Sequence, residues 1–105
     1  TNPAASLRIA EFCITNGGAS TVAHNFEKFH ITDPSTSLRM AELCIDKGGA
    51  SGVAQNFEKF QITDPSISLS IAELCIDKGE VRSVAQNFQK FHLLFLLFLS
   101  RCVLQ

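Results

Sequence analysis

The sequence repeats itself at an interval of 31 residues. Three copies, residues 1–31, 32–62 and 63–93, align without gaps, and neighbouring copies are identical at 21 of 31 positions. A unit of this length is too short to bury a core alone, so its copies are expected to stack and share one continuous core. The repeat therefore predicts an open array of small units and argues against a single closed globular enzyme.

Each copy marks the start and the end of its first helix, most clearly in the middle copy. Asp33 can accept hydrogen bonds from the free N–H groups of a helix start, and Pro34 suits the first helical position. Gly48 and Gly49 follow the apolar stretch, and glycine readily adopts the left-handed conformation that ends many helices. We therefore expect a helix between Asp33 and Gly48, followed by a tight turn.

Two apolar patterns distinguish the two helices of the middle copy. The first helix is apolar around most of its girth, with one narrow polar stripe formed by Arg39, Glu42 and Asp46. It should therefore be covered on several sides by neighbouring copies. The second helix carries apolar residues at spacings of three and four on one face: Ala50, Val53, Ala54, Phe57 and Phe60. The residues expected to face outward, which would place this helix at the surface, are Gln55, Asn56, Glu58 and Lys59.

These patterns predict an all-α fold, a right-handed α-solenoid of three 31-residue helix–turn–helix repeats over residues 1–93. The short connection makes the two helices of a copy antiparallel neighbours. Stacked pairs present repeated side chains in register along an extended face. The two open ends of such an array make self-association a further expectation.

The repeat stops abruptly after Leu93, and residues 94–105 form an apolar C-terminal tail. Three interpretations stay open: a continuation of the last helix over the open end, the start of a membrane anchor, and sequence that is not native. The apolar run Leu93–Leu99 is only seven residues long, and a membrane-spanning helix needs ~20. We therefore predict no membrane span and a dispensable tail.

Three cysteines, Cys13, Cys44 and Cys75, recur at the repeat interval in the apolar stretch of each first helix. Equivalent residues on stacked helices lie ~8–10 Å apart, whereas a disulfide needs Cα atoms within ~7 Å. The spacing also fits no zinc site, whose ligands lie a few residues apart. We expect three free, buried thiols, a more reactive Cys102, and an intracellular (cytoplasmic) protein in a reducing compartment.

No set of residues suggests catalysis. The histidines are expected to be solvated surface residues: His24, His30 and His92. Glu11 follows Arg8 at an interval of three, as in the middle copy, which is the spacing of an ion pair on one helix. No nucleophile, base and orienting group can be assembled, and no phosphate-binding glycine motif occurs. We therefore expect no enzymatic activity, no cofactor and no metal site.

The charges and the differences between copies bear on the partner. The net charge is −1, so there is no basic excess to neutralise a nucleic-acid backbone. The copies differ mainly around the inter-helix turn, where Asn16 is replaced by Lys47 and Lys78. Relaxed surface loops would give this pattern, and so would a row of loops that reads different ligand units.

The residues of the repeat resemble two known families. The 31-residue period, the Asp33-Pro34 opening, the Leu38-Arg39 pair and Gly-x4-Val leading into the second helix resemble short HEAT-like repeats of phycobilisome-lyase type. That resemblance implies a protein-binding scaffold. In this chain the Leu-Arg pair falls about two residues late, and the alanine-rich run of those repeats is absent.

The turn Asn16-Gly17-Gly18, which varies between copies, is similar to the base-reading loop of transcription-activator-like effector repeats. This second resemblance implies base contacts near Asn16, Lys47 and Lys78. Those repeats are a few residues longer and carry a proline inside the second helix, and this chain has neither feature.

The sequence thus predicts a non-catalytic binding scaffold. A protein or peptide is the first candidate partner, and sequence-specific binding of nucleic acid through the variable turns is the alternative. The expected contact residues are the polar positions of the second helices and the turns: Asn25, Asn56, Asn87, Lys28, Lys59, Lys90, Asn16, Lys47 and Lys78.

Overall fold

The computed structural model describes residues 3–91, and every regular element in that range is a helix, which confirms the all-α prediction. The α-helices are α1 (Pro3–Cys13), α2 (Ala19–His24), α3 (Pro34–Cys44), α4 (Ala50–Gln55), α5 (Pro65–Asp77) and α6 (Val81–Gln86). Three 3-10 helices follow the even-numbered helices: Phe26–Phe29, Phe57–Phe60 and Phe88–Phe91. The predictions for His92, Cys102 and the tail at 94–105 lie outside the described residues.

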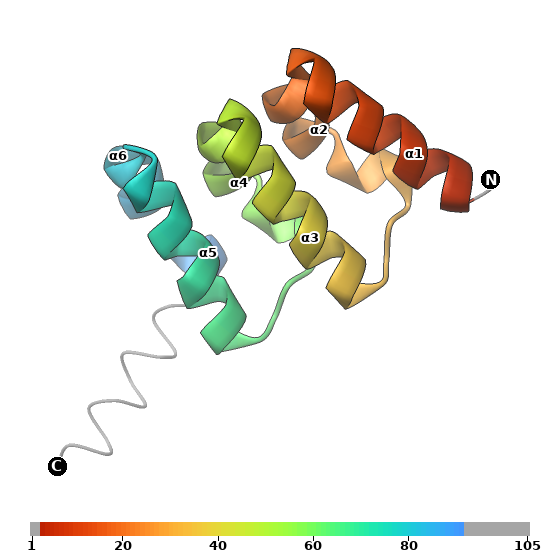
Figure 1. The fold of residues 1–105 in the computed structure, drawn as a ribbon. Coiled ribbons are helices and arrows are strands. Elements are labelled where there is room, and N and C mark those ends of the chain that lie inside the picture. The colour runs from red at the N-terminus through yellow and green to blue at the C-terminus, as the bar shows by residue number, and fades with distance from the viewer. Residues whose placement is uncertain (1–2, 92–105) are drawn as a thin grey trace, which may run out of the picture.

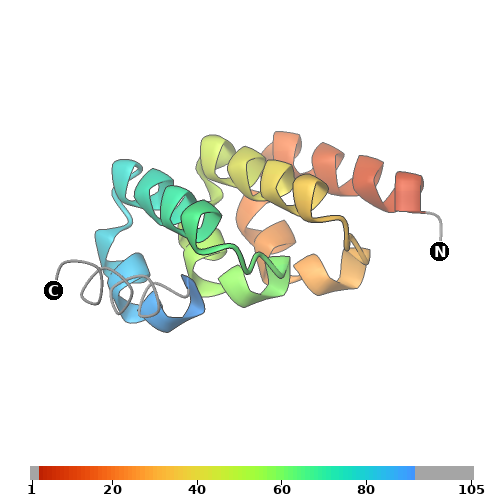
Figure 2. The same ribbon diagram turned by 90° about the horizontal axis from the view of Figure 1, so that it is seen from below.

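The helices form two layers. One layer consists of α1, α3 and α5 side by side, and the other consists of α2, α4 and α6 with the 3-10 helices (Figures 1 and 2). We call each odd-numbered helix and the even-numbered helix that follows it a helix pair. Helices α2 and α4 also pack across to the next helix pair, because α2 contacts both α3 and α4 while α4 contacts both α5 and α6. The second layer therefore joins successive helix pairs.

The helix starts follow the predicted capping. The carboxylate of Asp33 accepts a hydrogen bond from the backbone N–H of Thr36 at 3.0 Å, and that of Asp64 accepts one from Ser66 at 2.8 Å. A proline follows each aspartate, where the missing N–H leaves no bond unmade. The predicted starts of α3 and α5 are confirmed.

The paired glycines of the turn have two different functions. Gly48 has φ +93° and open space where a Cβ would lie, so its backbone conformation alone favours glycine. Gly49 has negative φ, but a Cβ there would lie 2.7 Å from the Cβ of Ala19 in α2. Gly48 therefore turns the chain, and Gly49 allows the preceding helix pair to approach.

The first helix of the middle copy is covered on several sides, as its pattern predicts. Met40, Ala41 and Cys44 are fully buried in α3, while Arg39 and Glu42 are exposed. The ion pairing differs from the prediction, however. Arg39 reaches Glu11 of α1 at 3.6 Å rather than Glu42 of its own helix, so this pair joins two helix pairs.

The second helix was predicted as one continuous element, and this prediction is wrong. Helix α4 ends at Gln55, and Asn56 leaves helical geometry with φ −121° and ψ 26°. The Asn56 side chain donates a 2.9 Å hydrogen bond to the carbonyl of Gly52, and asparagine often competes for backbone partners in this way. The 3-10 helix that follows has three residues per turn, so Phe57 and Phe60 lie in line and are both buried.

The prediction that the second helix lies at the surface is confirmed only in part, because Gln55 and Glu58 are exposed whereas Asn56 is buried and Lys59 is half-buried. Within α4 only Ser51 and Gln55 are not buried. Gly52 explains the difference, because a Cβ at this position would lie 3.0 Å from the Cα of Ser20 in α2. The small residues of α4 allow other helices to approach it from both sides, so less of this helix is exposed than its pattern predicts.

Stacked phenylalanines join successive helix pairs. The rings of Phe26 and Phe60 lie 4.1 Å apart between centroids, and those of Phe57 and Phe91 lie 4.3 Å apart. The members of the two pairs are related by the 31-residue interval, so the same contact occurs at both junctions. All four rings are buried, and offset stacking adds about 0.5–1.5 kcal/mol to the burial of each pair.

The close approach at Gly49 can be tested against a matched glycine. Gly18 occupies the same position in the first copy, and a Cβ at either residue would meet the carbonyl oxygen five residues earlier at 2.9 Å. Only Gly49 also faces Ala19. We expect Gly49→Ala to lower the free energy of unfolding by about 1–3 kcal/mol more than Gly18→Ala, because it alone overpacks the junction. Urea unfolding measures both, and equal losses would show that the junction tolerates the methyl group.

Candidate binding surfaces

The side chains of the three asparagines predicted as contacts bond to the backbone of their own helices. The side-chain amides of Asn25, Asn56 and Asn87 each donate to the carbonyl four residues earlier, at 3.0, 2.9 and 2.8 Å. Asn56 is 8% exposed, so the prediction that it faces outward is wrong. These three residues end the second helices and start the 3-10 turns, which explains their recurrence without a ligand.

Two of the three expected lysine contacts also lie within the fold. Lys59 donates to the backbone carbonyl of His24 and lies 3.6 Å from the carboxylate of Glu27. Lys90 repeats this arrangement one interval later, with the carbonyl of Gln55 at 2.6 Å and Glu58 at 3.5 Å. Both are half-buried and connect adjacent helix pairs. Only Lys28 is exposed and makes no such contact among the described residues.

The variable turn residues are exposed, as predicted. Asn16, Lys47 and Lys78 lie in the turns after α1, α3 and α5, which line one edge of the array (Figure 1). The Asn16 amide donates to the carbonyl of Phe12 at 2.7 Å, so one of its polar groups caps α1. The ammonium groups of Lys47 and Lys78 have no hydrogen bond or ion pair with the described residues, and these turns stay available to a ligand.

A polar groove between α2 and α4 was not predicted. It has a volume of about 300 Å³. Its walls carry hydroxyl, amide, imidazole and glycine groups only: Ser20, Thr21, His24, Asn25, Ser51, Gly52, Gln55 and Asn56. His24 and Gln55 are exposed and occupy equivalent positions in successive copies. The recurrence of polar side chains at this position was a sequence pattern that could have indicated the groove. The groove was missed because the whole second helix was assigned to the surface.

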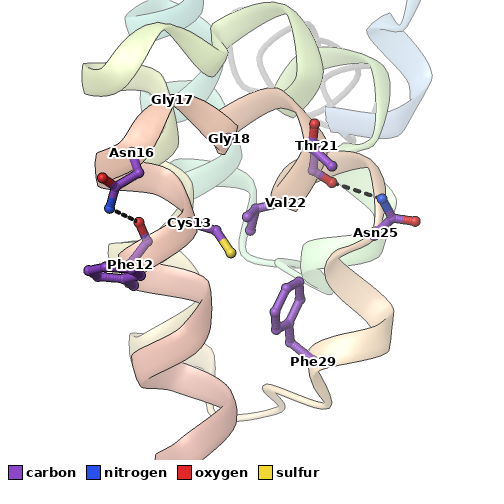
Figure 3. A pocket seen from close by; sticks show the side chains of 9 residues that line it. All are labelled: Phe12, Cys13, Asn16, Gly17, Gly18, Thr21, Val22, Asn25 and Phe29. Carbon is purple, nitrogen blue, oxygen red and sulfur yellow. Dashed lines mark hydrogen bonds between the residues drawn. The ribbon is translucent and has the colours of Figure 1, made fainter.

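An apolar pocket lies at the other side of α2, at the N-terminal end of the array. It has a volume of about 520 Å³ and is lined by residues of α1, the following turn, α2 and the first 3-10 helix. Cys13 and Val22 face each other across it, and the ring of Phe29 lies at one end (Figure 3). Phe12, which also lines the pocket, is 72% exposed. Sequence reasoning missed this pocket, because its apolar lining residues Cys13, Val22 and Phe29 occupy positions expected in the core.

The three cysteines among residues 3–91 are free thiols, and two of them are fully buried. Burial raises the pKa of the Cys44 thiol to about 12, and burial followed by the negative charge of Glu80 does the same for Cys75. The prediction of free, buried thiols is confirmed for these two residues. Cys13 is only half-buried, because it lines the N-terminal pocket. A protonated, buried thiol is a poor nucleophile and a poor metal ligand.

The described residues contain no group of three or more histidine, cysteine, aspartate or glutamate side chains that could hold a metal ion. His24 and His30 are exposed, as predicted. No helix between residues 3 and 91 is both long enough and apolar enough to cross a membrane.

No protein family, no curated protein and no solved structure matches the chain. The resemblances to HEAT-like and effector repeats therefore stay predictions.

The buried thiols predict how stability depends on pH. Above the ordinary thiol pKa of 9.0, Cys44 and Cys75 lose protons in the unfolded chain but keep them in the folded protein up to about pH 12. The folded state then binds more protons, so stability falls with rising pH, by up to about 1.4 kcal/mol per pH unit for each thiol. Urea unfolding at a series of pH values should show a flatter decline above pH 9.0 for the Cys44→Ala, Cys75→Ala variant than for the wild type. Parallel declines would mean that the two thiols titrate alike in both states.

Proposed function

We propose that the chain is a non-catalytic α-solenoid scaffold that binds a protein or peptide along its second-helix layer. The solenoid part of the proposal is supported by the contacts that recur at the 31-residue interval. The phenylalanine stack, the lysine-to-carbonyl bond and the lysine–glutamate pair each occur at both junctions between helix pairs. Residues repeated in the sequence thus make repeated contacts, and the three helix pairs act as structural repeats.

The polar groove carries the binding proposal. His24, Gln55 and Gln86 are exposed at equivalent positions of α2, α4 and α6, so they form a row across the layer. Each offers a hydrogen-bond donor and an acceptor, which suits the alternating N–H and C=O groups of a peptide backbone. Neighbouring packed helices are ~8–10 Å apart, a distance that about three residues of an extended peptide span. A peptide lying across the helices could therefore meet successive members of the row.

The charge distribution favours a polypeptide over nucleic acid. The chain has nine basic and ten acidic residues, and two of the lysines already contact carbonyls and carboxylates within the fold. Lys47 and Lys78 remain at the edge formed by the turns, too few for the usual series of phosphate contacts. The free buried thiols of Cys44 and Cys75 agree with a reducing intracellular compartment, which is part of the proposal.

The test uses peptides that are selected from a random displayed library because they bind the immobilised chain. Their affinity is measured by fluorescence anisotropy for the wild type, for His24→Ala with Gln55→Ala, and for Glu42→Ala as a control. Glu42 is exposed on α3, in the other layer. We expect the double variant to bind about tenfold more weakly, a loss of about 1.4 kcal/mol, and the control to bind like the wild type.

The same titration with random single-stranded and duplex DNA and RNA, at low and physiological salt, tests the alternative. Tight binding of nucleic acid with a steep dependence on salt, reduced by changing Lys47 and Lys78 to alanine, would replace the peptide proposal. Selected peptides that bind the double variant and the wild type equally would also contradict it, because the row would then carry none of the affinity.

A further inference from the structure

Most residues that line the N-terminal pocket recur 31 positions later, at the junction between the first and second helix pairs. The pocket residues Val22 and Phe29 correspond, 31 positions later, to Val53 and Phe60. At those later positions the preceding helix pair fills the space, because Phe26 stacks on Phe60 and Ser20 lies against Gly52. The pocket is therefore the acceptor side of this junction, and no helix of residues 3–91 covers it as α2 covers the equivalent position of the next copy.

The last helix pair presents the opposite side of the same junction. Ala19, Ala23 and Phe26 are buried where α2 and its 3-10 helix pack on the second helix pair, at 2, 0 and 1% exposure. Their counterparts in the third copy are Val81, Ala85 and Phe88. Val81 is 58% exposed, Ala85 is exposed and Phe88 is only half-buried. The described part of the chain thus has an unfilled acceptor side at α1–α2 and an uncovered donor side at α6.

We propose that copies of this chain associate head to tail, with α6 and the 3-10 helix Phe88–Phe91 of one copy packed into the N-terminal pocket of the next. The interface continues the junction already present twice within the chain. Phe88 would stack on Phe29 as Phe26 stacks on Phe60. The larger Val81 would face Gly18, which has no side chain, where Ala19 faces Gly49.

Polar groups at the two ends of the chain would also pair when two copies dock in this arrangement. Arg39 pairs with Glu11 inside the chain, and the corresponding groups of two docked copies are Arg8 and Glu73. Both are exposed and make no ion pair with the described residues. Lys28 likewise lacks the carbonyl partner that Lys59 and Lys90 have, and the backbone oxygen of Gln86 would supply it.

One position makes this interface weaker than the internal junctions. Glu27 and Glu58 pair with the lysine of the next copy, but the third copy has Gln89 at that place. Association should therefore be reversible and depend on concentration. A head-to-tail contact does not close on itself, so it produces chains of increasing length.

Two variants that each block one side test the geometry. Thr21→Arg places a charged side chain in the pocket, where Gly52 lies against Ser20 in the next copy. Ala85→Arg places the same residue on the uncovered side of α6. Both positions are exposed in the single chain, so the monomer should keep its helical circular dichroism. Ser70→Arg is the matched control, since it introduces the arginine that the first two copies carry there and lies on neither end.

Sedimentation velocity over a wide range of concentration is measured on the full chain. We expect wild type and Ser70→Arg to gain mass with concentration, and each blocked variant alone to stay at the 11.5 kDa monomer. An equimolar mixture of the two blocked variants retains one intact donor side and one intact acceptor side. It should therefore form a pair of about twice the 11.5 kDa monomer mass and nothing larger.

Three outcomes would overturn the proposal. These are a monomeric wild type at all concentrations, blocked variants that associate as the wild type does, and a mixture that fails to pair. Association of Ala85→Arg alone would indicate a symmetric contact between two pockets instead. None of these outcomes depends on peptide binding, which is measured separately through His24 and Gln55, so failure of either proposal is recognised independently.

Discussion

The stacking of one phenylalanine on another across each junction is the contact on which the array depends. Phe26 on Phe60 and Phe57 on Phe91 are the same interaction at two places, although their surroundings differ. Gly49 and Gly52 lie at the first junction, whereas Glu80 and Ser83 occupy the corresponding positions at the second junction. The ring stack persists through this change, so it defines how one helix pair sits on the next, and the glycines adjust how closely the helices approach.

The remaining features of the junction follow from this stack. The 3-10 helices turn both phenylalanines of a copy inward. In the middle copy, one ring stacks on the preceding copy and the other stacks on the following copy. A spacing of three residues achieves this in a 3-10 turn. The adjacent lysine is thereby brought to a carbonyl at the end of the preceding second helix, where a helix terminus attracts positive charge. These recurring polar groups therefore make contacts within the fold, and the exposed row at His24 and Gln55 is the surface that we propose for a partner.

The sequence was sufficient to predict the helix starts and the glycine turns, but not the break in the second helix or the packing between copies. Capping by Asp33, the left-handed Gly48 and the buried Cys44 all follow from rules that act within a few residues, and each is confirmed. The burial of Asn56 and the inward reach of Lys59 depend on the neighbouring helix pair, which a pattern within one copy does not contain. Arg39 illustrates the same limit, because spacing alone favoured Glu42 and the structure pairs it with Glu11. The polar groove was missed for the same reason, since it forms only where two copies meet.

A double-mutant cycle on Phe26 and Phe60 tests the account most directly. Each phenylalanine is changed to leucine, singly and together, and the free energy of unfolding is measured by urea titration. Phe26 and Phe91, which do not stack on each other, provide the reference cycle. The account predicts a coupling energy of about 0.5–1.5 kcal/mol for the stacked pair and a value near zero for the reference pair. Equal coupling in the two cycles would contradict it, because the rings would then contribute only their burial and no specific contact between neighbouring helix pairs.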